Sequence, residues 1–61
     1  MNAAAVVRLL EKHGWILKTQ KGSHKQLVHP RKPGKITVAS HGKKDIPPGT
    51  LNAIFKQAGL K

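Results

Sequence analysis

The chain contains no cysteine and no tyrosine, and only two aromatic residues, among its 61 residues. Without cysteine it cannot form a disulfide scaffold, a thiolate metal site or a thiol nucleophile. Its length predicts a single domain over residues 1–61, because domains mostly run to about 50 residues or more. The lack of cysteine fits a reducing cytoplasm, where we expect the protein to act. No apolar run approaches the ~18 residues of a membrane span and the N-terminal residues lack a signal-peptide pattern, so we expect no membrane partner.

Acidic residues are also scarce. Glu11 and Asp45 are the two carboxylates, against 12 lysines and arginines, and the formal net charge is +10. Two carboxylates so far apart in the sequence do not suit a two-metal nuclease. A charge this large on a small surface concentrates polyanions. Nucleic acid is therefore the first candidate partner, ahead of an acidic protein and of anionic lipid.

Candidate metal ligands are also few. The four histidines could suggest zinc, but His24 and His29 lie five residues apart in a predicted strand and therefore on opposite faces of it. No cysteine is available to complete such a site. We therefore expect neither a bound metal nor another cofactor.

Apolar residues recur with helical spacing at both ends of the chain. The two stripes have the spacing i, i+3, i+4, i+7 and consist of Ala3, Val6, Val7 and Leu10, and of Leu51, Ile54, Phe55 and Ala58. Asn2 can cap a first helix over residues 3–13, and Pro48 can open the second helix. Gly14 and Gly59 follow the stripes and predict Schellman endings, in which Trp15 and Leu60 fold back on their helices.

Three β-prone segments lie between these helices, at residues 15–20, 24–29 and 35–39. Turn residues separate them, and connections this short imply an antiparallel meander. The order is therefore α-β-β-β-α. It predicts an α+β fold in which two helices cover one face of a three-stranded antiparallel sheet. Trp15, after a helix end, and Phe55, within a stripe, are expected in the core.

Strand alternation places one histidine on the uncovered face of this sheet. Leu27 is the largest apolar residue of the second strand and should face the helices, so His24, Gln26 and Val28 should point to the open face. A neutral, exposed imidazole among lysines can deprotonate a ribose 2′-hydroxyl while the lysine charges stabilise the phosphorane. Position alone does not separate this role from that of an idle, solvated histidine.

Several short segments, taken together and in order, carry a family resemblance. They are Gly14-Trp15, Lys21-Gly22-Ser23-His24, His29-Pro30, the loop His41-Gly42-Lys43-Lys44-Asp45, and the ending from Gly49-Thr50-Leu51 to Gly59-Leu60. In these segments the chain resembles the HicA-type toxins, small mRNA interferases of HicA–HicB toxin–antitoxin pairs. The resemblance spans almost the whole chain. It implies a double-stranded-RNA-binding-like fold, ribosome-independent mRNA cleavage with His24 as the catalytic histidine of the Gly-Ser-His motif, and a HicB-type antitoxin that masks this histidine.

The resulting hypothesis is a metal-independent endoribonuclease toxin with His24 acting on the 2′-hydroxyl. The residues expected to bind RNA are the turn and the neighbouring lysines: Lys21, Gly22, Ser23, Lys25, Lys43 and Lys44. Lys25 stands where many family members carry a second histidine. The donor of the proton to the leaving 5′-oxygen is open between water, a lysine and His24 itself. The alternative function is a non-catalytic double-stranded-RNA-binding module, which reads about 16 base pairs and leaves the RNA intact.

Overall fold

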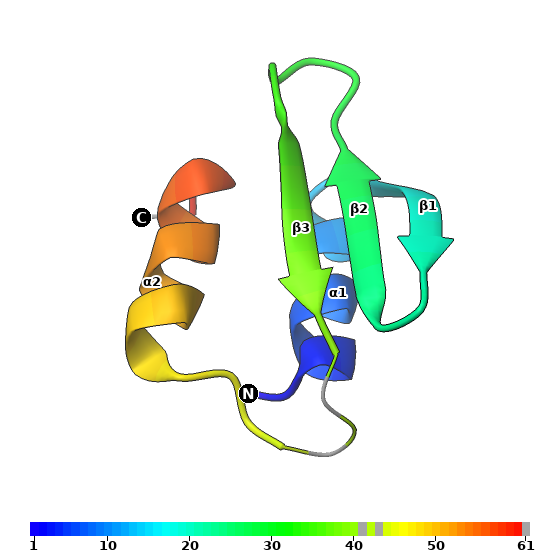
Figure 1. The fold of residues 1–61 in the computed structure, drawn as a ribbon. Helices are drawn as coiled ribbons and strands as arrows, with labels where there is room; N and C mark the ends of the chain where they lie inside the picture. Colours follow the sequence, from blue (N-terminus) through cyan, green and yellow to red (C-terminus); the bar gives the residue numbers. More distant parts are fainter. Residues whose placement is uncertain (41, 43, 61) are drawn as a thin grey trace.

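The computed structural model of the chain describes residues 1–40, 42 and 44–60. Its elements, in chain order, are α1 (Ala3–Lys12), β1 (Ile16–Lys21), β2 (His24–Val28), β3 (Lys35–Ala39) and α2 (Pro48–Gln57) (Figure 1). The strands form one antiparallel sheet in the order β1-β2-β3. The predicted α-β-β-β-α order is confirmed. Within the described part of the chain, neither helix is long and apolar enough to cross a membrane.

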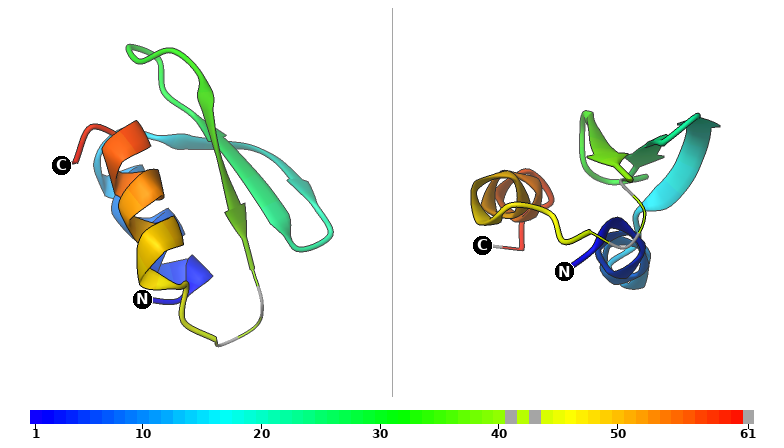
Figure 2. Two further views of the ribbon diagram at one scale, coloured as in Figure 1. Left: turned by 60° about the vertical axis from the view of Figure 1, so that its left-hand side comes forward. Right: turned by 60° about the horizontal axis from the view of Figure 1, so that its bottom comes forward.

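Both helices lie on the same side of the sheet, and the other face is open (Figure 2). α1 packs behind the strands and contacts β1 and β3, whereas α2 lies along β3 at the edge of the sheet. The buried core combines the helical stripes with the inward residues of the strands: Ala3, Val6, Val7, Leu10, Trp15, Leu27, Ile36, Val38, Ile54 and Ala58. Trp15 is buried as predicted, and Phe55 is half-buried and packs against this cluster.

The ends of α1 are set by local hydrogen bonds. The side chain of Asn2 accepts a hydrogen bond from the Ala5 N–H at 2.9 Å, as an N-cap residue does. At the other end Gly14 has φ +93°, and the Trp15 N–H donates to the Leu10 carbonyl at 3.0 Å. This is the predicted Schellman ending, and it turns the chain so that the indole of Trp15 enters the core.

His29 joins the end of β2 to the end of α1. Its Nδ1 accepts a hydrogen bond from the Arg31 N–H at 3.0 Å, so the hydrogen of the neutral ring is on Nε2, which donates to the His13 carbonyl at 3.1 Å. The ring also meets Trp15 edge-on, with 5.2 Å between the centroids. Both ring nitrogens of His29 are therefore engaged in structural contacts.

Two side-chain hydrogen bonds hold α2 at the edge of β3. Gln57 Nε2 donates to the Lys35 carbonyl at 2.8 Å, and Lys32 Nζ donates to the Ala58 carbonyl at 2.8 Å. The first bond engages a backbone carbonyl of the outer strand, and the second satisfies a carbonyl at the C-terminus of α2. The sequence predicts Gln57 to be an ordinary surface residue. In the structure it is exposed, and its amide fastens the helix to the sheet.

We expect Gly14→Ala to destabilise the protein by about 2–3 kcal/mol, because two costs add. Alanine is strained at φ +93°, and a Cβ on this residue would lie 2.8 Å from His29 Nε2, which would have to leave the His13 carbonyl. Gly34→Ala is the matched control, because Gly34 has φ +82° with open space around it. Alanine at this position introduces the backbone strain without a clash with another side chain. Urea denaturation followed by Trp15 fluorescence measures both. Equal losses in the two variants would show that the His29 contact contributes nothing.

Candidate functional site

A tight turn between β1 and β2 presents His24. The two-residue loop is Gly22-Ser23, with φ +57° at Gly22 and no positive φ at Ser23, which is the pattern of a type II′ turn. Lys21 and His24 pair directly across the loop. The Ser23 carbonyl accepts a hydrogen bond from the Ser40 N–H at 2.6 Å, which ties the turn to the end of β3. The position of His24 is therefore set by all three strands.

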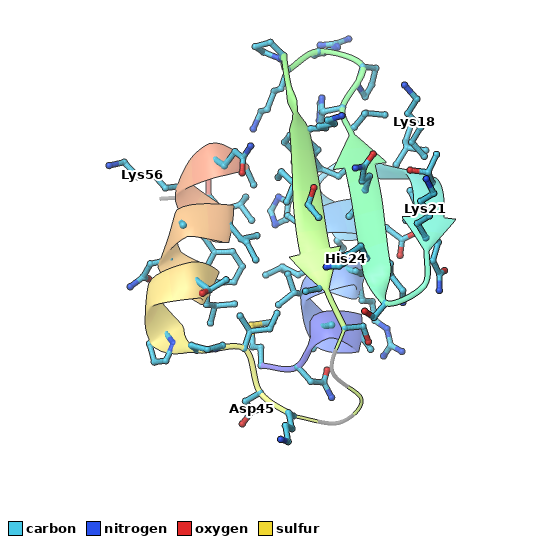
Figure 3. The ribbon with its side chains drawn as sticks, in the orientation of Figure 1. Lys18, Lys21, His24, Asp45 and Lys56 are labelled. Atoms are coloured by element: carbon cyan, nitrogen blue, oxygen red, sulfur yellow. The ribbon has the colours of Figure 1, made fainter. Side chains whose placement is uncertain are left out.

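The strand register puts His24 on the open face of the sheet. Residues directly opposite one another in an antiparallel pair share a face. Leu27 pairs with Ile36, and both are fully buried beneath the sheet. His24 has the opposite parity from Leu27, pairs with Ala39, and is exposed (Figure 3). The predicted alternation along β2 is confirmed.

A β-bulge in β1 brings Lys21 to the same face. The register between β1 and β2 shifts between Leu17 and Thr19, so Lys18 is an extra residue in β1. Leu17 lies opposite the buried Leu27 and therefore shares the inward face, whereas Thr19, two residues on, lies on the open face. Without the bulge, strict alternation would give Lys21 the parity of Leu17 and turn its ammonium group towards the helices.

His24 stands between two hollows of the surface. The first has a volume of about 450 Å³, lies over β1 and β2, and is lined by Thr19, Gln20, Lys21, His24 and Gln26. The second, which we call the β3–α2 groove, has a volume of about 670 Å³ and is lined by His24, Thr37, Ala39, Lys44, Asp45, Ile46, Pro47, Thr50 and Ile54. A chain molecule that crosses the open face from one hollow to the other passes over the imidazole.

The other predicted site residues lie at different places around this histidine. Lys21 is its cross-strand neighbour, and Lys44 lines the β3–α2 groove. Lys25 is half-buried and pairs with the buried Val38, so the structure does not bring it to the face of His24. Lys43 lies outside the described residues. Binding of RNA by these lysines and by the turn stays a prediction.

Sequence reasoning missed two polar residues of the groove, Thr37 and Thr50. Alternation around the buried Ile36 and Val38 could have placed Thr37 on the open face. Thr50 comes from α2, and its place depends on how that helix packs along β3. No sequence pattern indicates that packing.

The carboxylates and histidines of the described residues do not form a cluster. Among the residues that the structure describes, no three His, Asp or Glu side chains form a group that could hold a metal ion. Asp45 lies at the far rim of the groove (Figure 3), mostly exposed, with its carboxylate 3.7 Å from the amino group of Met1. Glu11 is exposed on α1, behind the sheet.

Fold and site together define a small, strongly basic α+β domain whose open sheet face presents an imidazole beside a lysine. The family model of the HicA toxin of bacterial toxin–antitoxin systems matches residues 3–60. The chain therefore belongs to the HicA toxin family, and the resemblance found in its motifs is confirmed. Membership of this family makes the protein a toxin that has an antitoxin as its partner. A comparison with curated proteins finds no match.

Proposed function

We propose that this toxin is an endoribonuclease that cleaves mRNA without a metal ion and so arrests translation, with His24 as its catalytic residue. The observation that carries the proposal is the place of His24: exposed on the open face, opposite Lys21, between two hollows. The net charge of +10 supplies the attraction for RNA. Membership of the HicA toxin family supports the proposal independently.

The reaction needs a base and a stabilised phosphorane. The imidazole of His24 takes the proton of a ribose 2′-hydroxyl, and the 2′-oxygen attacks the adjacent phosphorus. The bond from phosphorus to the 5′-oxygen of the next nucleotide breaks, which leaves a 2′,3′-cyclic phosphate and, after this oxygen gains a proton, a 5′-hydroxyl. Lys21 stabilises the negative charge that develops on the phosphorane. Water, a lysine or the imidazolium of His24 supplies the proton to the leaving oxygen.

Lysines around the open face hold the RNA backbone. Lys21 acts from the hollow over β1 and β2, and Lys44 acts from the groove on the other side of His24. Two further lysines are proposed phosphate contacts: Lys25, which does not share the face of His24, and Lys43. Gly22 and Ser23 shape the turn. Each neutralised phosphate releases counterions, so affinity for RNA falls steeply as salt is raised.

The antitoxin, in this proposal, is an acidic HicB-type protein that covers the open face and masks His24. Opposite charges steer such a partner to the basic domain and accelerate its association. The docked partner excludes RNA from His24 because both occupy the same face.

Purified protein is expected to cleave a generic mRNA at the same rate with and without EDTA, since His24 and the lysines need no metal ion. The same RNA carrying 2′-O-methyl groups is expected to stay intact, because its nucleophile is blocked. Gel electrophoresis measures both. Cleavage that EDTA abolishes and added metal restores would refute the metal-free reaction. Cleavage of the methylated RNA would refute attack by the 2′-oxygen. A protein that leaves mRNA intact and binds double-stranded RNA in preference to single-stranded RNA would favour the non-catalytic binding module.

A further inference from the structure

We propose that the β3–α2 groove holds an unpaired base of the RNA, next to the bond that His24 cleaves. This inference rests on the proposed function, because RNA is its ligand. It adds a binding site for a base of that RNA, and it assigns a role to the groove residues of β3 and α2.

The lining of the groove suits a base better than a phosphate. Apolar side chains make up much of it: Ala39, Ile46, Pro47 and Ile54. Two hydroxyl groups, of Thr37 and Thr50, stand among them and can donate or accept hydrogen bonds at the edge of a base. A mostly apolar hollow with a few polar groups is the usual form of a small-molecule site, and about 670 Å³ lies within the usual range of volumes.

The two hollows beside His24 differ in chemistry. The hollow over β1 and β2 is lined by Lys21 and by polar side chains, whereas the β3–α2 groove has the apolar lining described above together with the charged side chains of Lys44 and Asp45. Figure 3 shows Lys18 and Lys21 together on the β1 side of His24. An RNA strand that lays its phosphates along the cationic side therefore directs a base towards the apolar side. The scissile phosphate then lies over His24, between the two.

The walls of the groove are held before RNA arrives. Gln57 and Lys32 fasten α2 to the sheet and to the loop between β2 and β3, and the Ile46 N–H donates to the Met1 carbonyl at 2.7 Å. A preformed site loses little entropy when it is filled. A base stacked and paired in a duplex cannot enter the groove, so the groove selects single-stranded RNA.

Binding of 2′-O-methyl oligonucleotides tests this inference without any cleavage. The probes are a single strand of mixed sequence, an abasic strand with the same number of phosphates, and the corresponding duplex. Wild-type protein is expected to bind the single strand about tenfold more tightly than the abasic strand or the duplex, because a base is buried against apolar side chains. Fluorescence anisotropy at one fixed salt concentration gives the three dissociation constants.

Filling the groove from either wall should remove this preference. Ala39→Leu fills it from β3 and Thr50→Leu fills it from α2, and each variant is expected to bind the single strand about as weakly as the abasic strand. Ala4→Leu is the matched control, because Ala4 is exposed on α1 behind the sheet, and it should keep the wild-type preference. Circular dichroism verifies that the variants are folded.

Two outcomes would overturn the inference. Wild-type protein could bind the three probes equally, or both groove variants could keep the full preference for the single strand. If variants that keep the preference also lose binding of the antitoxin, the groove is assigned to the protein partner. Failure of the proposed function gives a different result: natural mRNA stays intact, while the protein can still bind the single strand more tightly than the abasic probe.

Discussion

Replacing His24 with alanine is expected to slow mRNA cleavage by about 10²–10⁴-fold, the usual contribution of a positioned general base. The loss should appear in the rate of the chemical step, since the lysines that hold the RNA remain. His24 is exposed on the open face and contributes nothing to the buried core, so the variant should fold as the wild type does. His24→Gln should be equally inactive, because an amide keeps a polar side chain but accepts no proton at neutral pH.

Single-turnover cleavage of mRNA, together with binding of 2′-O-methyl RNA, separates chemistry from affinity in these variants. His13→Ala is the matched control: it removes an exposed histidine from the C-terminal end of α1, away from the open face, and should cleave like the wild type. Wild-type rates in both His24 variants would remove His24 from the mechanism. An equal loss in His13→Ala would show that the effect is not specific to the open face.

The order of helices and strands could be predicted because it follows from local patterns, which depend only on residues close together in the sequence. The stripe that ends at Leu10, the glycine at position 14 and the indole after it specify a helix and its termination, and the structure has both hydrogen bonds of that ending. The alternation around Leu27 likewise assigns His24 to the open face, because the side chains of a regular strand change face at every residue.

The surroundings of His24 depend on contacts that no local pattern contains. Lys21 reaches the open face only because Lys18 is an extra residue in β1, and nothing in the β-prone segment from Trp15 to Gln20 marks the position of the bulge. Thr50 reaches the groove only because α2 lies along β3, where bonds such as that from Gln57 to the Lys35 carbonyl hold it. The sequence therefore predicts the histidine better than it predicts the cavity beside it.

Truncation of Trp15 is expected to have the largest effect on stability. Trp15→Ala removes a side chain that is 2% exposed and should cost about 3–5 kcal/mol. A domain of this size has about 3–9 kcal/mol of stability in total, at roughly 0.05–0.15 kcal/mol per residue. The variant should therefore be partly or wholly unfolded at 25 °C. Thermal and urea denaturation followed by circular dichroism measures the loss without using tryptophan fluorescence.

Trp15→Phe separates the volume of the indole from its polar atom. Within the part of the chain that the structure describes, Trp15 Nε1 is buried without a hydrogen-bond partner, so phenylalanine gives up no bond and removes an unsatisfied donor. The smaller ring loses some packing against the edge of His29, whose centroid lies 5.2 Å away. We expect a net cost of about 1 kcal/mol, well below that of alanine. A Trp15→Phe variant as unstable as Trp15→Ala would contradict this account. The loss of stability would then be due to removal of the indole nitrogen and not to the loss of buried volume.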